Sequence, residues 1–244
     1  KKTPDLRVKG ILDEKKAFTG PKIAQVDITN NCNLNCVGCW CHSELMEEMK
    51  FKGDFKKKHL SLKKIKELID DLHDMETKEI QLSGSGDPSM HPDFMEVVKY
   101  IKAQGFKLHI ITNFTLFNKE KIKKLVDLRV DKLTISFWAG TIETYLKTHP
   151  NQTKKTYHKL KKDLQYLYQL KKGKFLPKVR IYNVISSLNY YEIEEMIDFA
   201  LDVMADYIEF QAVDVVEGKS NSLALTEEHK ANILKQFEKI SKRN

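Results

Sequence analysis

Three cysteines lie close together near the start of the chain in the spacing C-x3-C-x2-C: Cys32, Cys36 and Cys39. They follow a short apolar run, residues 23–28, whose pattern is typical of a β-strand. Thiolates at this density bind a soft metal centre, which is either an iron–sulfur cluster or zinc. A cluster of four irons held by three cysteines leaves one iron without a protein ligand. That iron can bind a substrate or a cofactor directly.

Zinc requires a fourth ligand, and Cys41 or His42 is the nearest candidate. Cys41 stands only two residues from Cys39, so we expect it to be a reduced, packed thiol rather than a fourth ligand to a cluster. All of the cysteines lie within residues 32–41, so no disulfide framework is possible. This pattern is typical of a reducing compartment and predicts a cytoplasmic protein.

The cysteine motif at the end of a first strand resembles the signature of the radical S-adenosylmethionine (radical SAM) superfamily. The resemblance implies that Cys32, Cys36 and Cys39 bind a [4Fe–4S] cluster. The amino and carboxylate groups of S-adenosylmethionine (SAM) would chelate the open iron. An electron from the reduced cluster would then cleave SAM to a 5′-deoxyadenosyl radical, which abstracts a hydrogen atom from the substrate. The chemistry is that of an oxidoreductase.

A glycine-rich turn, residues 82–88, follows the second apolar run and resembles the Gly-Gly-Glu-Pro motif of the same superfamily. The resemblance implies that Asp87 and the backbone of Ser85 and Gly86 bind the ammonium group of SAM through a charge-assisted hydrogen bond. Aspartate is one methylene shorter than glutamate, so either the loop moves inward or a water bridges the gap. The alternative interpretation is a plain tight turn.

Two polar residues at later strand ends match further SAM-binding positions of the superfamily. Asn113 corresponds to a position near the methionine part of SAM, where the superfamily often has Asn-Gly, and here Phe114 follows it. Ser136 corresponds to a polar position that contacts the SAM carboxylate or ribose. The alternatives are that Asn113 only turns the chain and that Ser136 is a buried structural hydroxyl.

The residue before the third cysteine is often aromatic in the superfamily, where it helps to hold adenine. Here that residue is Gly38, and Trp40 follows the third cysteine instead. The resemblance implies that the backbone of Gly38 still contacts adenine while Trp40 packs on the cluster loop. A simple core position for Trp40 is the alternative.

Three further patterns concern the later strands. Trp138, just after the fourth apolar run, is a candidate wall of the substrate cavity. Arg180 and Asn183 alternate with apolar residues on the fifth run, which predicts a polar face pointing into the lumen. Asn189 stands three residues before Glu192, which predicts a capping pair at the next helix.

Six apolar runs recur along the chain, and each is followed by a helical pattern. They are residues 23–28, 79–83, 107–112, 132–137, 179–185 and 207–212. Strands that alternate with helices predict an α/β fold with a parallel sheet. Six units match the partial (β/α)6 TIM-like barrel of the radical SAM superfamily, although periodicity alone also allows an open doubly wound sheet. In both folds, ligands bind at the carboxyl ends of the strands.

We expect residues 1–22 to be a lead-in segment and residues 23–244 to be a radical SAM core domain with a C-terminal helix that starts near Thr226. The chain begins without methionine and stops within a helical pattern, which favours a further C-terminal region. Many relatives carry a C-terminal extension with auxiliary clusters (SPASM-like).

The composition excludes several classes of protein. Of 244 residues, 41% are hydrophobic and 31% are charged, as expected for a globular domain rather than a disordered chain. No apolar run approaches the ~20 residues that cross a bilayer, so no membrane span is expected. The formal charge of +8 comes mostly from lysines interleaved with acids. The scarcity of arginine argues against a nucleic-acid partner.

The substrate is open at this stage. We expect modification of a peptide or protein, or of a small polar molecule such as a sugar. A tRNA-modifying enzyme is an alternative, which the basic charge and the pair Cys39-Trp40 favour. A zinc-stabilised, non-catalytic binding domain is the alternative from another class. The resemblance also implies a reductase or a flavodoxin- or ferredoxin-type electron donor.

Overall fold

The computed structural model describes residues 5–242, without the side chain of Arg7. Six parallel strands form one sheet in the order of the sequence, so β1 and β6 are its edges. The strands are β1 Ile23–Val26, β2 Glu79–Leu82, β3 Lys107–Thr112, β4 Lys132–Ser136, β5 Lys178–Ile185 and β6 Tyr207–Ala212. This order confirms the predicted partial barrel, because a doubly wound sheet would reverse its strand order part-way.

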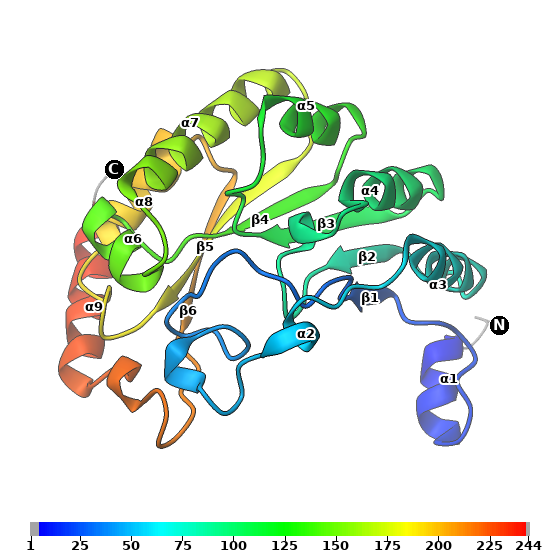
Figure 1. The fold of residues 1–244 in the computed structure, drawn as a ribbon, viewed down its shortest axis with the longest axis horizontal. Helices are drawn as coiled ribbons and strands as arrows, with labels where there is room; N and C mark the ends of the chain where they lie inside the picture. Colours follow the sequence, from blue (N-terminus) through cyan, green and yellow to red (C-terminus); the bar gives the residue numbers. More distant parts are fainter. Residues whose placement is uncertain (1–4, 243–244) are drawn as a thin grey trace.

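Helices cover the convex side of the curved sheet, as Figure 1 shows for α3, α4, α5, α7 and α8. The loop after β1 lies on the open, concave side. The helices are α1 Leu6–Asp13, α2 Gly53–Lys56, α3 Leu62–Asp74, α4 Phe94–Ala103, α5 Lys119–Asp127, α6 Ile142–Thr148, α7 Lys154–Lys171, α8 Ile193–Asp202 and α9 Glu227–Ile240. Between residues 5 and 242, no helix combines the length and the apolar character that a bilayer crossing needs.

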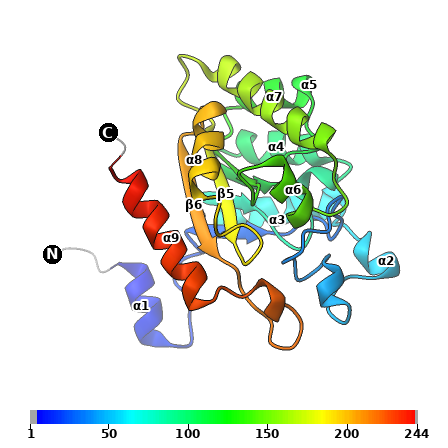
Figure 2. The ribbon, with the colours of Figure 1, turned by 90° about the vertical axis from the view of Figure 1, so that its left-hand side faces the viewer.

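One helix lies near each end of the described residues. The expected C-terminal helix is α9, which Thr226 caps through its side chain. Helix α1 forms inside the expected lead-in segment and stands apart from the sheet in Figure 2. Residues 1–4 of that segment and residues 243–244 of the expected core lie outside the described residues.

The alternation of side chains along β5 corrects one prediction. Asn183 is fully buried on the same face as Ile181 and Ile185, whereas Arg180 is only half-buried on the opposite face. Residues three apart on a strand point to opposite sides, so Arg180 and Asn183 cannot share the lumen face. Only the Arg180 part of the prediction is correct.

A hydrogen-bonded row crosses the concave face of four neighbouring strands. The guanidinium of Arg180 donates through Nε to Thr134 Oγ1 at 3.0 Å and forms an ion pair with Glu209. Thr134 Oγ1 also lies 2.8 Å from Nε2 of His109. Because Thr134 already accepts from Arg180, its single hydroxyl proton is free to be donated to His109, which requires a neutral imidazole.

The buried His109 is predicted to make the fold sensitive to acid. Burial, followed by the positive charges of Lys132 and Arg180, lowers the pKa of His109 to about 4. A histidine whose pKa is lower in the folded state stabilises that state above pH ~6.5 and loses the contribution as the pH falls toward 4. We expect the free energy of unfolding to fall by about 1 to 2 kcal/mol more for the wild type than for His109→Gln between pH 7.5 and 5. Denaturant unfolding at both pH values measures this difference.

The exposed His73 on α3 provides the control for this experiment. His73→Gln is expected to show the same loss of stability with acid as the wild type. Equal losses for His109→Gln and the wild type would show that His109 does not contribute.

Candidate cofactor site at the carboxyl ends of the strands

A cavity of about 360 Å³ lies where the carboxyl ends of the strands meet the loop after β1. Its lining includes all the residues predicted to hold a metal or a cofactor: Cys32, Cys36, Cys39, Gly38, Trp40, Ser85, Gly86, Asp87, Asn113 and Ser136. The structure therefore brings these residues together from four separate segments of the chain. Their individual roles stay predictions.

The cysteine loop is held in a compact turn by its own backbone. The Cys39 N–H donates to the Cys36 carbonyl at 2.9 Å, and the Ser43 hydroxyl donates to the Val37 carbonyl at 2.6 Å. The Val37 N–H donates to the carbonyl of Thr148, the last residue of α6, at 3.0 Å. These bonds orient the loop against the barrel independently of any metal.

The thiols lie within one another's electrostatic field. Burial raises the pKa of Cys36 well above its usual range, and the Cys32 and Cys39 thiolates add to the effect. Burial, followed by the Asp87 carboxylate, raises the pKa of Cys32 to about 12. Three buried thiolates this close need cationic compensation, which a metal centre provides when it displaces their protons.

The donor set fits an iron–sulfur cluster better than a single zinc ion. Among the side chains of residues 5–242, no three His, Cys, Asp or Glu groups converge tightly enough to hold one ion. A cube of four irons separates its cysteine sulfurs more widely than a single ion does. Of the two candidate fourth ligands, Cys41 is not part of the cavity lining, and His42 lines the cavity with its Nε2 engaged 2.8 Å from the Ser85 carbonyl.

The glycine-rich turn approaches the end of β1 so closely that side chains are excluded. A Cβ atom on Gly84 would overlap the carboxylate of Asp27, and one on Gly86 would overlap the carbonyls of Thr29 and Asn31. The Asp27 carboxylate accepts the Ser85 N–H at 2.7 Å. Asp27 was missed from the sequence, although an acid at the carboxyl end of a parallel strand is a recognisable sign of a site.

The buried carboxylate of Asp87 braces two strand ends. It accepts hydrogen bonds from the Ser89 N–H at 2.9 Å and the Asn113 N–H at 2.7 Å. The hydroxyls of Ser89 and Thr112 also donate to it, at 2.5 and 2.9 Å. Asp87 thus fixes the turn after β2 to the end of β3, while the predicted contact with SAM stays a prediction.

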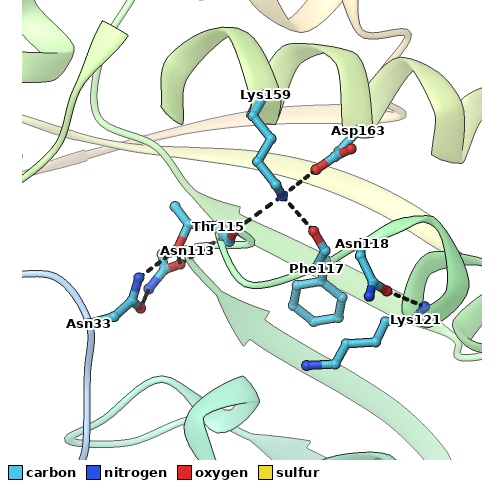
Figure 3. A network of polar contacts seen from close by, with 8 residues as sticks. All are labelled: Asn33, Asn113, Thr115, Phe117, Asn118, Lys121, Lys159 and Asp163. Carbon is cyan, nitrogen blue, oxygen red and sulfur yellow. Dashed lines mark hydrogen bonds and ion pairs between the residues drawn. The ribbon is translucent and has the colours of Figure 1, made fainter. Parts of the chain in front are cut away.

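Figure 3 shows how Asn113 connects the cysteine loop to the rest of the barrel. Its side-chain amide donates to Asn33 Oδ1 at 3.0 Å and lies 3.9 Å from the Cys32 sulfur. Asn33 in turn donates to the Thr115 hydroxyl at 2.8 Å. The side chain of Asn113 is therefore oriented by contacts on both sides rather than free in the cavity.

The loop after Asn113 is clamped from outside by α7. The ammonium of Lys159 donates to the carbonyls of Thr115 and Phe117 at 3.2 and 2.5 Å (Figure 3). Asp163, one turn along the same helix, pairs with Lys159 at 2.6 Å. Neither residue was found from the sequence, because the partners of Lys159 are backbone carbonyls more than 40 residues away and Asp163 acts only through Lys159.

Comparison with known proteins identifies the family. A model described as "Radical SAM superfamily" matches residues 26–200, most of the chain. The chain belongs to the radical SAM superfamily. Enzymes of this superfamily use a [4Fe–4S] cluster and SAM, as expected from the cysteine motif.

Two curated relatives illustrate the range of activities. A tungsten-containing aldehyde ferredoxin oxidoreductase cofactor-modifying protein from Pyrococcus furiosus is 30% identical over 76% of this chain and 49% of its own length. A PqqA peptide cyclase from Bradyrhizobium diazoefficiens is 24% identical over 80% of this chain and 47% of its own. The chain therefore spans about half the length of these curated relatives.

Solved structures confirm the fold. Streptococcus suis SuiB bound to S-adenosylmethionine superposes with a TM-score of 0.73, at 16% identity, over 98% of this chain and 52% of SuiB. Together with the sheet order, this similarity confirms the partial (β/α)6 barrel.

Two departures from the superfamily motifs have structural consequences. Phe114 stands where the superfamily often has glycine, and its φ of 62° is in the left-handed region that glycine favours. Its ring is fully buried and stacks on Phe117 with centroids 4.4 Å apart. Packing of the aromatic pair compensates for the unfavourable backbone conformation at this radical SAM position.

Gly38 is the second departure. A Cβ atom at this residue would lie 3.4 Å from Cζ3 of Trp138, so the indole of Trp138 occupies the space beside the third cysteine. Trp138 also lines the cavity, and its φ of 58° is strained. Trp40 lines the same cavity with 46% of its surface exposed, so it is not a core residue.

Asn189 and Glu192 hold the Trp138 loop and correct the capping prediction. The Asn189 amide donates to the Trp138 carbonyl at 2.9 Å, and its oxygen accepts the N–H of Ser186. Glu192 makes no capping bond to α8, so the predicted capping pair is wrong. Its buried carboxylate instead accepts the Gly140 N–H at 3.0 Å and the Thr144 hydroxyl at 2.5 Å.

Removal of the Glu192 carboxylate is predicted to destabilise this side of the cavity. Glu192→Ala leaves buried backbone and hydroxyl donors without an acceptor, so we expect the free energy of unfolding to fall by about 3 kcal/mol. Glu192→Gln keeps one acceptor oxygen and should lose less. Glu67→Ala, on the exposed surface of α3, is the control and should change stability by less than about 0.5 kcal/mol. Urea unfolding of the wild type and the three variants measures these free energies. If Glu192→Ala changes the free energy of unfolding no more than Glu67→Ala does, Glu192 does not brace the loop.

Proposed function

We propose that this chain is the catalytic core of a radical SAM enzyme. Cys32, Cys36 and Cys39 hold a [4Fe–4S] cluster, and the remaining cavity binds SAM. The observation that carries the proposal is the convergence of the cysteine loop and the glycine-rich turn on one cavity. Its volume of about 360 Å³ lies within the range of small-molecule sites.

A reduced cluster held by Cys32, Cys36 and Cys39 would supply the one-electron reductive cleavage of SAM on which removal of a hydrogen atom from the substrate depends. The contribution of the protein is to bind, orient and exclude water. We propose an acidic flavodoxin- or ferredoxin-type protein, or a dedicated reductase, as the electron source. Residues 23–244 would form the core domain, in the cytoplasm.

The polar rim of the cavity supports a defined orientation of SAM. The Asp87 carboxylate gives one end of the cavity a negative charge, which suits the ammonium group of the methionine part, and the Gly86 backbone lines the cavity beside it. The side chains of Asn113 and Ser136 line the cavity near the same end of the sheet and can donate to the carboxylate or ribose. The Ser85 carbonyl is already engaged by His42, so the Ser85 contribution is limited to its backbone position in the turn.

We assign the aromatic contact with adenine to Trp138. The superfamily's aromatic position is Gly38 here, and the Trp138 indole lies beside that glycine inside the cavity. A flat purine stacks favourably on such a ring. Trp40, which is more exposed, would close the outer side of the same pocket.

For the substrate, we propose a peptide or protein first and a small polar molecule second. Supporting the first choice, one relative is named a peptide cyclase, and SuiB has been solved with the precursor peptide SuiA. The Pyrococcus relative, named for cofactor modification, supports the second choice.

The cysteine assignment predicts a sharp difference between neighbouring thiols. Cys36→Ala, prepared without oxygen and reconstituted with iron and sulfide, should lose the cluster and produce no 5′-deoxyadenosine from SAM and dithionite. Cys41→Ala is the matched control and should keep about four irons per chain. Iron, sulfide and zinc analysis with chromatography of the products measures both. Near-normal activity in Cys36→Ala would reject the cysteine assignment. One zinc with no iron in the wild type would reject the enzyme proposal in favour of a zinc-stabilised domain.

The adenine assignment uses the fact that the chain has only two tryptophans, both in this cavity. Trp138→Ala should weaken SAM binding by about tenfold or more, because base stacking contributes ~1–3 kcal/mol. SAM should quench the fluorescence of Trp40→Phe, in which Trp138 is the only tryptophan, and should quench Trp138→Phe much less. Equal quenching of the two variants, with unchanged affinity of Trp138→Ala, would contradict the assignment.

A further inference from the structure

Tyr145 on α6 has a buried hydroxyl without a partner among the described residues. Only 1% of the residue is exposed. Its ring stacks on His149 with centroids 4.5 Å apart and on Phe137 at 5.3 Å. A phenylalanine would make the same ring contacts, whereas a buried hydroxyl without a partner costs about 1–3 kcal/mol. The hydroxyl therefore points to an acceptor that the protein atoms do not supply.

The cysteine loop is the neighbour that can present such an acceptor. The Val37 N–H, one residue after Cys36, bonds to the carbonyl of Thr148, one helical turn after Tyr145. The loop and this helix are therefore fixed against each other. Burial, followed by the negative charge of the Cys36 thiolate, raises the pKa of Tyr145 above its usual value. The phenol stays protonated, so it can act as a donor, and it lies within the field of that sulfur.

We propose that the Tyr145 hydroxyl donates a hydrogen bond to the Cys36 thiolate in the cluster-bound protein and thereby raises the reduction potential of the cluster. The inference rests on the proposed function, since it needs the cluster at these cysteines. Reduction adds negative charge to the cluster and its ligands. A donor to a ligand sulfur stabilises that charge, and hydrogen bonds to the sulfurs are among the main determinants of cluster potential.

The experiment compares two tyrosines of the same aromatic cluster. Tyr157 is also buried, with its ring 5.6 Å from that of Tyr145, but its hydroxyl already donates to the Gly140 carbonyl at 3.2 Å. In an anaerobic redox titration followed by electron paramagnetic resonance, Tyr145→Phe should show a more negative midpoint potential than the wild type. Tyr157→Phe should match the wild type.

Hyperfine spectroscopy in D2O provides an independent readout of the hydrogen bond. An exchangeable deuteron coupled to the reduced cluster in the wild type should be missing in Tyr145→Phe. Trp138→Phe should retain that coupling, because the indole Nε1, another buried donor without a partner among the described residues, is not its source. Loss of the coupling in Trp138→Phe and not in Tyr145→Phe would overturn the proposal.

The outcomes separate this inference from the proposed function. If the wild type holds no iron–sulfur cluster, the proposed function itself fails. If Tyr145→Phe holds a full cluster with the potential and the deuteron coupling of the wild type, only the role of Tyr145 is refuted. If Tyr145→Phe does not fold, the wild-type sequence can be made with fluorotyrosine, which is a stronger hydrogen-bond donor than tyrosine. Its cluster should then have a more positive midpoint potential than that of the unmodified protein. An unchanged midpoint potential would overturn the proposal.

Discussion

The buried carboxylate of Asp87 is the interaction on which the geometry of the cavity depends. It accepts hydrogen bonds from its own turn after β2 and from Thr112 and Asn113 at the end of β3. A buried carboxylate is stable only when such donors surround it, so the loops at both strand ends are fixed relative to each other. The same contacts orient Asn113, which reaches across to the cysteine loop through Asn33. The same carboxylate that we propose for the ammonium group of SAM thus also fixes the two loops relative to each other.

The second constraint is the close approach of the glycine-rich turn to the end of β1. Gly84 and Gly86 leave no room for a Cβ atom, so the turn can lie directly against Asp27 and the backbone before the cysteines. This contact brings the first and second βα loops within reach of one ligand. The polar row of His109, Thr134 and Arg180 lies on the same face of the sheet, two residues before the cavity-lining residues Ile111 and Ser136 on β3 and β4.

Local sequence patterns predicted the six βα units and most of the cavity, whereas the choice of a partial barrel over an open doubly wound sheet came from the resemblance to the superfamily. Each βα unit is formed by one continuous segment of the sequence. The predictable strand ends carry the cysteines, the glycine-rich turn, Asn113 and Ser136. Contacts between distant segments were not predictable. Glu192 and Lys159 act on backbone groups far away in the sequence, and no local pattern distinguishes them from ordinary surface residues. Asn189 was misinterpreted because its spacing to Glu192 imitates a helix cap, whereas its amide is used by the Trp138 loop.

The departures from the superfamily motifs show that the role of a motif residue cannot always be assigned to the same sequence position. A side chain from another position can occupy the same space in the fold. Gly38 removes an aromatic ring from the cysteine loop, and Trp138 from the end of β4 lies in that space. Phe114 replaces a flexible residue by a bulky one, yet keeps its left-handed backbone because the ring is buried against Phe117. In both cases a residue from a neighbouring segment compensates for the change. Different side chains can therefore supply the same shape and polarity at the carboxyl edge of the sheet.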